Sequence, residues 1–165
     1  MNNFNWFEEE IFGFKNISLF ILGSVVLYFI LSVLGLIFLT QVLKIEVADA
    51  ASFDEINIYS MPVILLIGAI LEEIIFRLIP LGLSMVCWGK SYKVFVVAIL
   101  SSVVFGWGHN GFEHVFIQGW GGIIFSIVFL KAGGFQEKFF KATFCCTIAH
   151  FSFNAILFVL QHLPK

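Results

Sequence analysis

The sequence predicts an all-α protein, a polytopic transmembrane helical bundle of about five spans with a polar site inside the bundle. Of its 165 residues 60% are hydrophobic and only 12% are charged, whereas a soluble domain carries about 25% charged residues. The mean hydropathy is +1.01. Apolar runs close to the ~20 residues that cross a bilayer recur along the chain. These observations together exclude an ordinary soluble domain.

The apolar runs divide the chain into spans and loops. An aromatic and acidic stretch, Asn2–Phe14, precedes the first run and is typical of an interfacial segment. A polar loop, Lys44–Ser60, follows the first run and carries Glu46, Asp49, Asp54 and Glu55. We expect Pro80 to kink the last part of the second span. The predicted spans are Ile17–Leu43, Met61–Cys87, Val94–Phe112, Val115–Leu130 and Ala142–Leu163.

The basic residues between these spans indicate the orientation. One side of the predicted bundle carries six lysines and the other carries two, if Arg77 within the second span is left out. By the positive-inside rule, the N-terminus is expected in the cytoplasm and the C-terminus outside. We expect a multi-pass protein, and we expect its location to be a bacterial plasma membrane. The first set is Lys15, Lys90, Lys93, Lys131, Lys138 and Lys141, and the second is Lys44 and Lys165.

Polar side chains interrupt three of the predicted spans. They form the patterns EExxxR, FxxxH and HxxxN. Burying a charge in lipid costs several kcal/mol, so such residues usually face a bundle interior and mark a functional site. Counted at about 1.5 Å per residue, Glu72, His109, His150 and Asn154 fall in one layer of the outer half of the bilayer. The three patterns comprise Glu72, Glu73, Arg77, Phe105, His109, His150 and Asn154.

The two adjacent glutamates are expected to have different roles, since neighbouring helix residues point about 100° apart. Glu73 and Arg77 have the i, i+4 spacing of a helical ion pair. This leaves Glu72 as the unpaired carboxylate, and a carboxylate in an apolar site suits a general base. The alternative interpretation is that both acids only hold the bundle together.

His109 and His150 are candidate catalytic residues that would assist this base. Phe105 precedes His109 by four residues and is expected to pack on its ring or to shape the pocket. His150 and Asn154 share one helix face, where a protonated imidazole and an amide could form an oxyanion site. The alternatives are an interfacial histidine that ends a helix, for His109, and polar contacts between helices, for His150 and Asn154.

A carboxylate base, two imidazoles and an amide can activate water and stabilise a tetrahedral intermediate. Hydrolysis of an amide bond is therefore a coherent reaction class for this set. Neither a GxSxG nor an HExxH pattern is present. Cys87, Cys145 and Cys146 form no CxxC pair and are interpreted as inert buried residues. The polar residues that follow His109 are either the outer rim of the site or an interfacial turn; they are Asn110, Glu113, His114 and Gln118.

The three patterns, in this order and on consecutive hydrophobic segments, resemble the CPBP family of intramembrane proteases. That family includes type II CaaX prenyl endopeptidases and bacterial proteins linked to bacteriocin maturation or self-immunity. The resemblance covers about Leu65 to Phe158. It implies that Glu72 activates the attacking water with help from His109, and that His150 and Asn154 bind the oxyanion. Glu73, Arg77 and Phe105 would support the site.

The resemblance also sets the expected cofactor and domain organisation. We expect that the activity requires no cofactor. A zinc ion held by Glu72, His109 and His150 is the alternative, since three ligands with an open position suit catalytic zinc. Residues 1–60 would form the interfacial segment, the first transmembrane helix and the acidic loop. Residues 61–163 would form the catalytic transmembrane core.

The expected partners are membrane lipid and a peptide or lipidated-peptide substrate. The net charge of −2 and the absence of a lysine and arginine cluster argue against a nucleic-acid partner. Two competing functions stay open. One is a catalytically inactive membrane scaffold or bacteriocin self-immunity protein. The other is a small transporter or proton relay, which the lack of inverted repeats disfavours.

Overall fold

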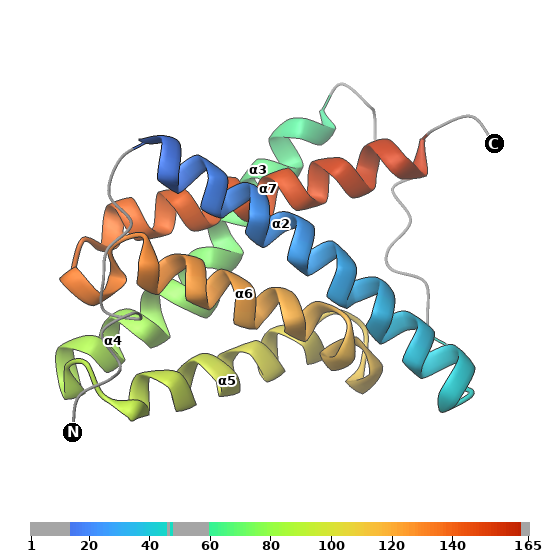
Figure 1. The fold of residues 1–165 in the computed structure, drawn as a ribbon, viewed down its shortest axis with the longest axis horizontal. Coiled ribbons are helices and arrows are strands. Elements are labelled where there is room, and N and C mark those ends of the chain that lie inside the picture. Colours follow the sequence, from blue (N-terminus) through green and yellow to red (C-terminus); the bar gives the residue numbers. More distant parts are fainter. Residues whose placement is uncertain (1–13, 46, 48–59, 163–165) are drawn as a thin grey trace.

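A computed structural model describes residues 14–45, 47 and 60–162 of the chain, and in these ranges every regular element is a helix (Figure 1). The predicted interfacial segment lies outside the described residues, apart from Phe14, and so do the four acidic residues of the predicted loop. In order, the elements are α2 (Phe14–Ile37), η1 (Phe38–Val42), α3 (Met61–Glu73), η2 (Ile74–Leu78), α4 (Ile79–Trp88), α5 (Tyr92–Trp107), η3 (Phe112–Phe116), α6 (Gln118–Lys131), η4 (Gly134–Gln136) and α7 (Phe139–Gln161).

The segment from α3 to α4 is one continuous helical run whose middle is widened. The π-helical segment η2 lies directly before Pro80, which occupies the first turn of α4. Proline has no backbone N–H, so it removes one helical hydrogen bond and disturbs the preceding turn. The expected effect of Pro80 therefore takes the form of a π-helical turn, a form that is frequent at functional sites.

The third and fourth predicted spans are shorter than the sequence indicated. The third was expected to continue to Phe112, but α5 ends at Trp107. Asn110 and Gly111 adopt φ values of 97° and 132°, which reverse the chain. At 16 and 14 residues, α5 and α6 fall below the ~20 residues that cross a bilayer. Within the described ranges, Asn16–Val42 and Phe139–Gln161 are long and apolar enough to span.

Helix α6 lies at the centre of the bundle. It packs against α5 along one side and against α7 and α2 on others, and α3 packs on α7 (Figure 1). Phe125 and Phe129 of α6 are completely buried in the core, which also includes Tyr28 of α2. Gly106 of α5 permits a close approach, because a Cβ there would lie 2.7 Å from the Cα of Val115. This contact holds η3 against the end of α5.

The distribution of apolar and charged side chains in the bundle is the inverse of that in a soluble protein. Large apolar side chains such as Leu22 and Val86 are 59% and 69% exposed. Charged side chains such as Glu73 and Arg77 are instead 0% and 1% exposed. An apolar exterior around buried ionisable groups is typical of a helical bundle in lipid.

Candidate active site

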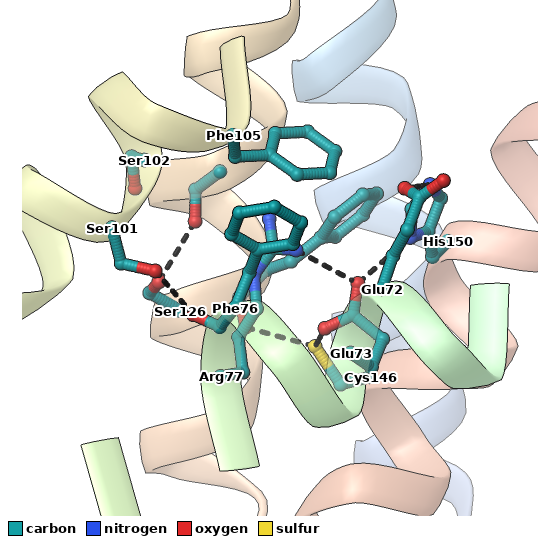
Figure 2. Close-up of polar contacts among 12 residues, drawn as sticks. Glu72, Glu73, Phe76, Arg77, Ser101, Ser102, Phe105, Ser126, Cys146 and His150 are labelled. Atoms are coloured by element: carbon teal, nitrogen blue, oxygen red, sulfur yellow. Dashed lines mark hydrogen bonds and ion pairs between the residues drawn. The ribbon is translucent and has the colours of Figure 1, made fainter. Parts of the chain in front are cut away.

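Glu73 and Arg77 form a completely buried ion pair at the junction of α3 and η2. Nη1 of Arg77 donates to Oε1 of Glu73 over 3.2 Å (Figure 2). This is the pair that the i, i+4 spacing predicts. The guanidinium also lies over the ring of Phe105, 4.3 Å from its centroid. The face of an aromatic ring attracts a cation, which compensates for part of the lost hydration of Arg77.

His150 of α7 joins the same carboxylate. Its Nδ1 lies 2.7 Å from Oε1 of Glu73, and the histidine is 3% exposed. An ionised carboxylate only accepts hydrogen bonds, so Nδ1 of His150 carries the proton and donates. Nε2 of His150 therefore presents a lone pair when the ring is neutral and an N–H when the ring is protonated.

The second oxygen of Glu73 also has a partner on α7. The thiol of Cys146 donates to Oε2 over 2.8 Å. The Glu73 carboxylate thus receives a guanidinium, an imidazole and a thiol, from its own helical run and from α7 (Figure 2). Such a set of donors satisfies a charge that would be very costly to bury alone.

His109 lies in the turn that follows α5, one turn beyond Phe105. Its Nδ1 is 2.7 Å from the carbonyl oxygen of Phe105, and the two rings pack with centroids 4.5 Å apart. A carbonyl oxygen accepts, so Nδ1–H donates and satisfies one of the carbonyls that a helix end leaves free. Nε2 of His109 is therefore free to act as an acceptor. The predicted third span, Val94–Phe112, included His109, and this part of the prediction is wrong because α5 ends at Trp107.

Glu72 faces both imidazoles. Its Oε2 lies 3.5 Å from Nε2 of His150 and 3.8 Å from Nε2 of His109. This oxygen is buried and has no hydrogen-bond partner within the described part of the chain, although the side chain as a whole is 32% exposed. With both rings neutral, three acceptors surround one small volume. That volume suits a group with protons to donate, such as a water molecule.

Asn154 is the predicted site residue for which the structure gives no polar contact. It lies half-buried on α7, one turn after His150. Its side chain makes no hydrogen bond to the other described residues. Its role as an oxyanion donor stays a prediction.

The three predicted zinc ligands come from separate segments: Glu72 from α3, His109 from the turn after α5 and His150 from α7. In residues 14–45, 47 and 60–162, no group of three His, Cys, Asp or Glu side chains is arranged to hold a metal ion. Nε2 of each histidine is directed at Glu72, but the predicted set of Glu72, His109 and His150 does not close into a coordination site.

Sequence reasoning missed two contributors to the site. Cys146 was interpreted as inert, yet it precedes His150 by four residues and so shares its helix face. That spacing could have indicated its place beside the site. Phe125, whose ring stacks on His150 with centroids 4.8 Å apart, carried no such signal.

The polar residues after His109 belong to the turn, to η3 and to the first residue of α6. His114 is buried, and its Nδ1 lies 2.7 Å from Oε1 of Gln118. This pair links η3 to the first turn of α6. The structure therefore gives His114 and Gln118 a structural contact at the start of α6.

Comparison with known proteins identifies one family. The family model described as type II CAAX prenyl endopeptidase Rce1-like matches residues 54–156. The matched segment contains every residue of the cluster described above. No curated protein and no solved structure matches the chain.

Proposed function

Because this chain belongs to the Rce1-like family of type II CAAX prenyl endopeptidases, we propose that it is an intramembrane endopeptidase that hydrolyses a peptide bond of a membrane-associated or lipidated peptide. The family is a membrane protease family. The glutamate-dependent mechanism and the assignment of residues are our own proposal.

The observation that carries the mechanism is the unpartnered Oε2 of Glu72 between two imidazole nitrogens. A water molecule bound there would donate one proton to Glu72 and the other to Nε2 of His109. The carbonyl of Phe105 orients His109 so that its Nε2 can accept this proton. Distances of this size in a substrate-free site are expected to shorten when substrate binds.

The proposed reaction has two proton transfers. Glu72 takes a proton from the water as its oxygen adds to the carbonyl carbon of the scissile bond. The resulting oxyanion accepts hydrogen bonds from Nε2–H of protonated His150 and from the amide of Asn154. The C–N bond then breaks, and Glu72 returns the proton to the leaving amine. The products are a carboxylic acid and an amine.

The buried pair of Glu73 and Arg77 supports this scheme through His150. The carboxylate that accepts from Nδ1 fixes the orientation of the ring, so that Nε2 is directed toward Glu72 and the proposed reaction site. Arg77 holds the Glu73 carboxylate in place through its ion pair. Phe105 supports three of these groups, since its ring contacts His109, His150 and Arg77.

We propose that the bundle is embedded in a membrane with about five spans, the N-terminus in the cytoplasm and the C-terminus outside. The lysine distribution, the two long apolar helices and the lipid-like exterior support this placement. The short helices α5 and α6 would cross with their ends close to the headgroups.

The first prediction tests the base. Glu72→Gln keeps the size of the side chain but cannot accept the proton, so we expect kcat to fall by roughly 10²–10⁴-fold. The protein should still accumulate in the membrane. The matched control is Glu137→Gln, which makes the same change at an exposed residue outside the cluster. Cleavage of prenylated and unmodified membrane-anchored peptides by the purified protein, with and without a chelator, is the measurement.

The outcomes separate the competing functions. Full cleavage by the Glu72→Gln variant would rule out the proposed mechanism. Loss of cleavage together with loss of protein would indicate a structural role for Glu72. Absence of cleavage by the wild type, with a biological effect that survives Glu72→Gln, would instead indicate the scaffold or immunity protein. Loss of cleavage on chelation would establish a metal requirement.

A further inference from the structure

The thiol of Cys146 is buried in direct contact with the central carboxylate of the site. Cys146 is 0% exposed, and its Sγ lies 2.8 Å from Oε2 of Glu73 and 3.0 Å from the carbonyl oxygen of Phe125. We propose that Cys146 is a positioning residue, which holds the Glu73 carboxylate at the angle that aligns His150. This inference rests on the proposed function.

The thiol has one proton for two acceptors. A hydrogen bond to an ionised group is about twice as strong as one to a neutral group. The S–H of Cys146 therefore points to Glu73, while the Phe125 carbonyl lies beside the sulfur. Figure 2 shows the sulfur directly beside the Glu73 carboxylate.

The two oxygens of Glu73 are not equally supported. Oε1 accepts from Arg77 and from His150, whereas the partner of Oε2 within the described part of the chain is Cys146. Without the thiol, Oε2 would be a buried carboxylate oxygen with no donor. The carboxylate would then gain from turning about its own axis to share the remaining donors. That rotation would move the acceptor on which His150 depends.

The two α7 residues act together because they lie one helical turn apart. Cys146 and His150 both reach Glu73 from the same face of α7, at i and i+4. They therefore hold the two oxygens of one carboxylate in a fixed orientation relative to α7. A change at Cys146 should alter the turnover of bound substrate and leave substrate binding intact.

Variants at two adjacent cysteines test the positioning role. Cys146→Ala removes the donor, and we expect kcat to fall about tenfold with KM unchanged. Cys146→Ser restores a donor, so kcat should return to within about threefold of the wild type. The matched control is Cys145→Ala, which removes a buried thiol from the same helix without touching Glu73. Its kcat should stay within about twofold of the wild type.

Infrared spectroscopy tests the hydrogen bond without any assay of activity. The S–H stretching band falls in frequency when the thiol donates to a carboxylate. Two double variants each retain one buried thiol: Cys87→Ala with Cys145→Ala retains Cys146, and Cys87→Ala with Cys146→Ala retains Cys145. We expect the band of Cys146 to lie at the lower frequency.

The results distinguish this inference from the proposed function. Wild-type kcat in Cys146→Ala, or equal S–H frequencies for the two thiols, would overturn the positioning role. A kcat that falls equally in Cys146→Ala and Cys146→Ser would overturn it too. If the wild type cleaves no better than Glu72→Gln, the proposed function fails, and the infrared comparison still decides the hydrogen bond.

Discussion

At the scale of single residues, the site depends on which nitrogen of each histidine carries the proton. Both rings donate through Nδ1, His109 to a backbone carbonyl and His150 to Glu73. Both Nε2 atoms therefore face Glu72. The two rings nevertheless differ in the acceptor of this hydrogen bond, which is a neutral carbonyl for His109 and a carboxylate for His150. We propose that His109 acts on the water and His150 on the oxyanion.

Asn154 gives the residue-scale prediction. If its amide donates to the oxyanion, Asn154→Ala should lower kcat roughly 10²–10³-fold with little change in KM, because the contact forms only in the transition state. The measurement is steady-state cleavage kinetics, with Ser152→Ala on the same helix as the control. An unchanged kcat would remove Asn154 from the mechanism.

At the scale of elements, the central feature is the π-helical turn before Pro80. Proline cannot supply the N–H that the carbonyl of Phe76, four residues earlier, would receive in an α-helix. The hydroxyl of Ser101 on α5 donates to this carbonyl instead (Figure 2). In membrane helices, neighbouring Ser and Thr side chains commonly satisfy groups freed by proline. Ser101 therefore couples α5, which precedes His109, to the turn that carries Arg77.

The element-scale prediction compares two adjacent serines. Ser101→Ala leaves the Phe76 carbonyl without its donor, so we expect the free energy of unfolding to fall by about 1–3 kcal/mol. Ser102→Ala should cost less, because the Ser102 hydroxyl bonds to the Ala98 carbonyl within its own helix. Thermal unfolding in detergent measures both. Equal losses of unfolding free energy would show that the interhelical hydrogen bond of Ser101 adds no more stability than the intrahelical one of Ser102.

At the scale of the whole molecule, α2 is part of the bundle although it lies outside the segment that the family model matches. Tyr28 of α2 is 3% exposed, stacks on Phe153 with centroids 3.8 Å apart, and meets Phe125 edge-on. A Cβ at Gly121 of α6 would lie 2.4 Å from Cζ of Tyr28. The glycine thus leaves space for the tyrosine, and through Phe125 the first helix reaches the ring that packs on His150.

The whole-molecule prediction is that the effect of Gly121→Ala on stability changes sign when the Tyr28 side chain is removed. Gly121→Ala should destabilise the wild type by about 1–3 kcal/mol, because the methyl group collides with Tyr28. In the Tyr28→Ala background the same change should stabilise by up to about 1 kcal/mol, since alanine favours a helix more than glycine does. The measurement is a double-mutant cycle of thermal unfolding.

Gly82→Ala is the control for this cycle. The nearest heavy atoms to a Cβ at Gly82 are 4.0 Å away, so the change should be favourable in both backgrounds. The same destabilisation by Gly121→Ala with and without Tyr28 would show that α2 does not dock on α6 through this pair.

The sequence by itself determined the helical class, the two long apolar helices, the ion pair of Glu73 and Arg77, and the likeness to an intramembrane protease family. These features are local, because a helix repeats every ~3.6 residues and brings i and i+4 together wherever it forms. The end of α5 and the start of α6 were not predictable, because the turn between them is built on positive φ values at Asn110 and Gly111, which the polar stretch after His109 does not indicate.

Only the tertiary structure decided how the three polar patterns meet. Glu72 could have faced lipid, and Cys146 could have been inert, since nothing in the spacing within one helix says which face packs against another. Glu73 instead binds His150 and Cys146 from α7, and Glu72 lies between two imidazoles from separate segments. The physical reason is that register between helices depends on side-chain packing across the whole interface.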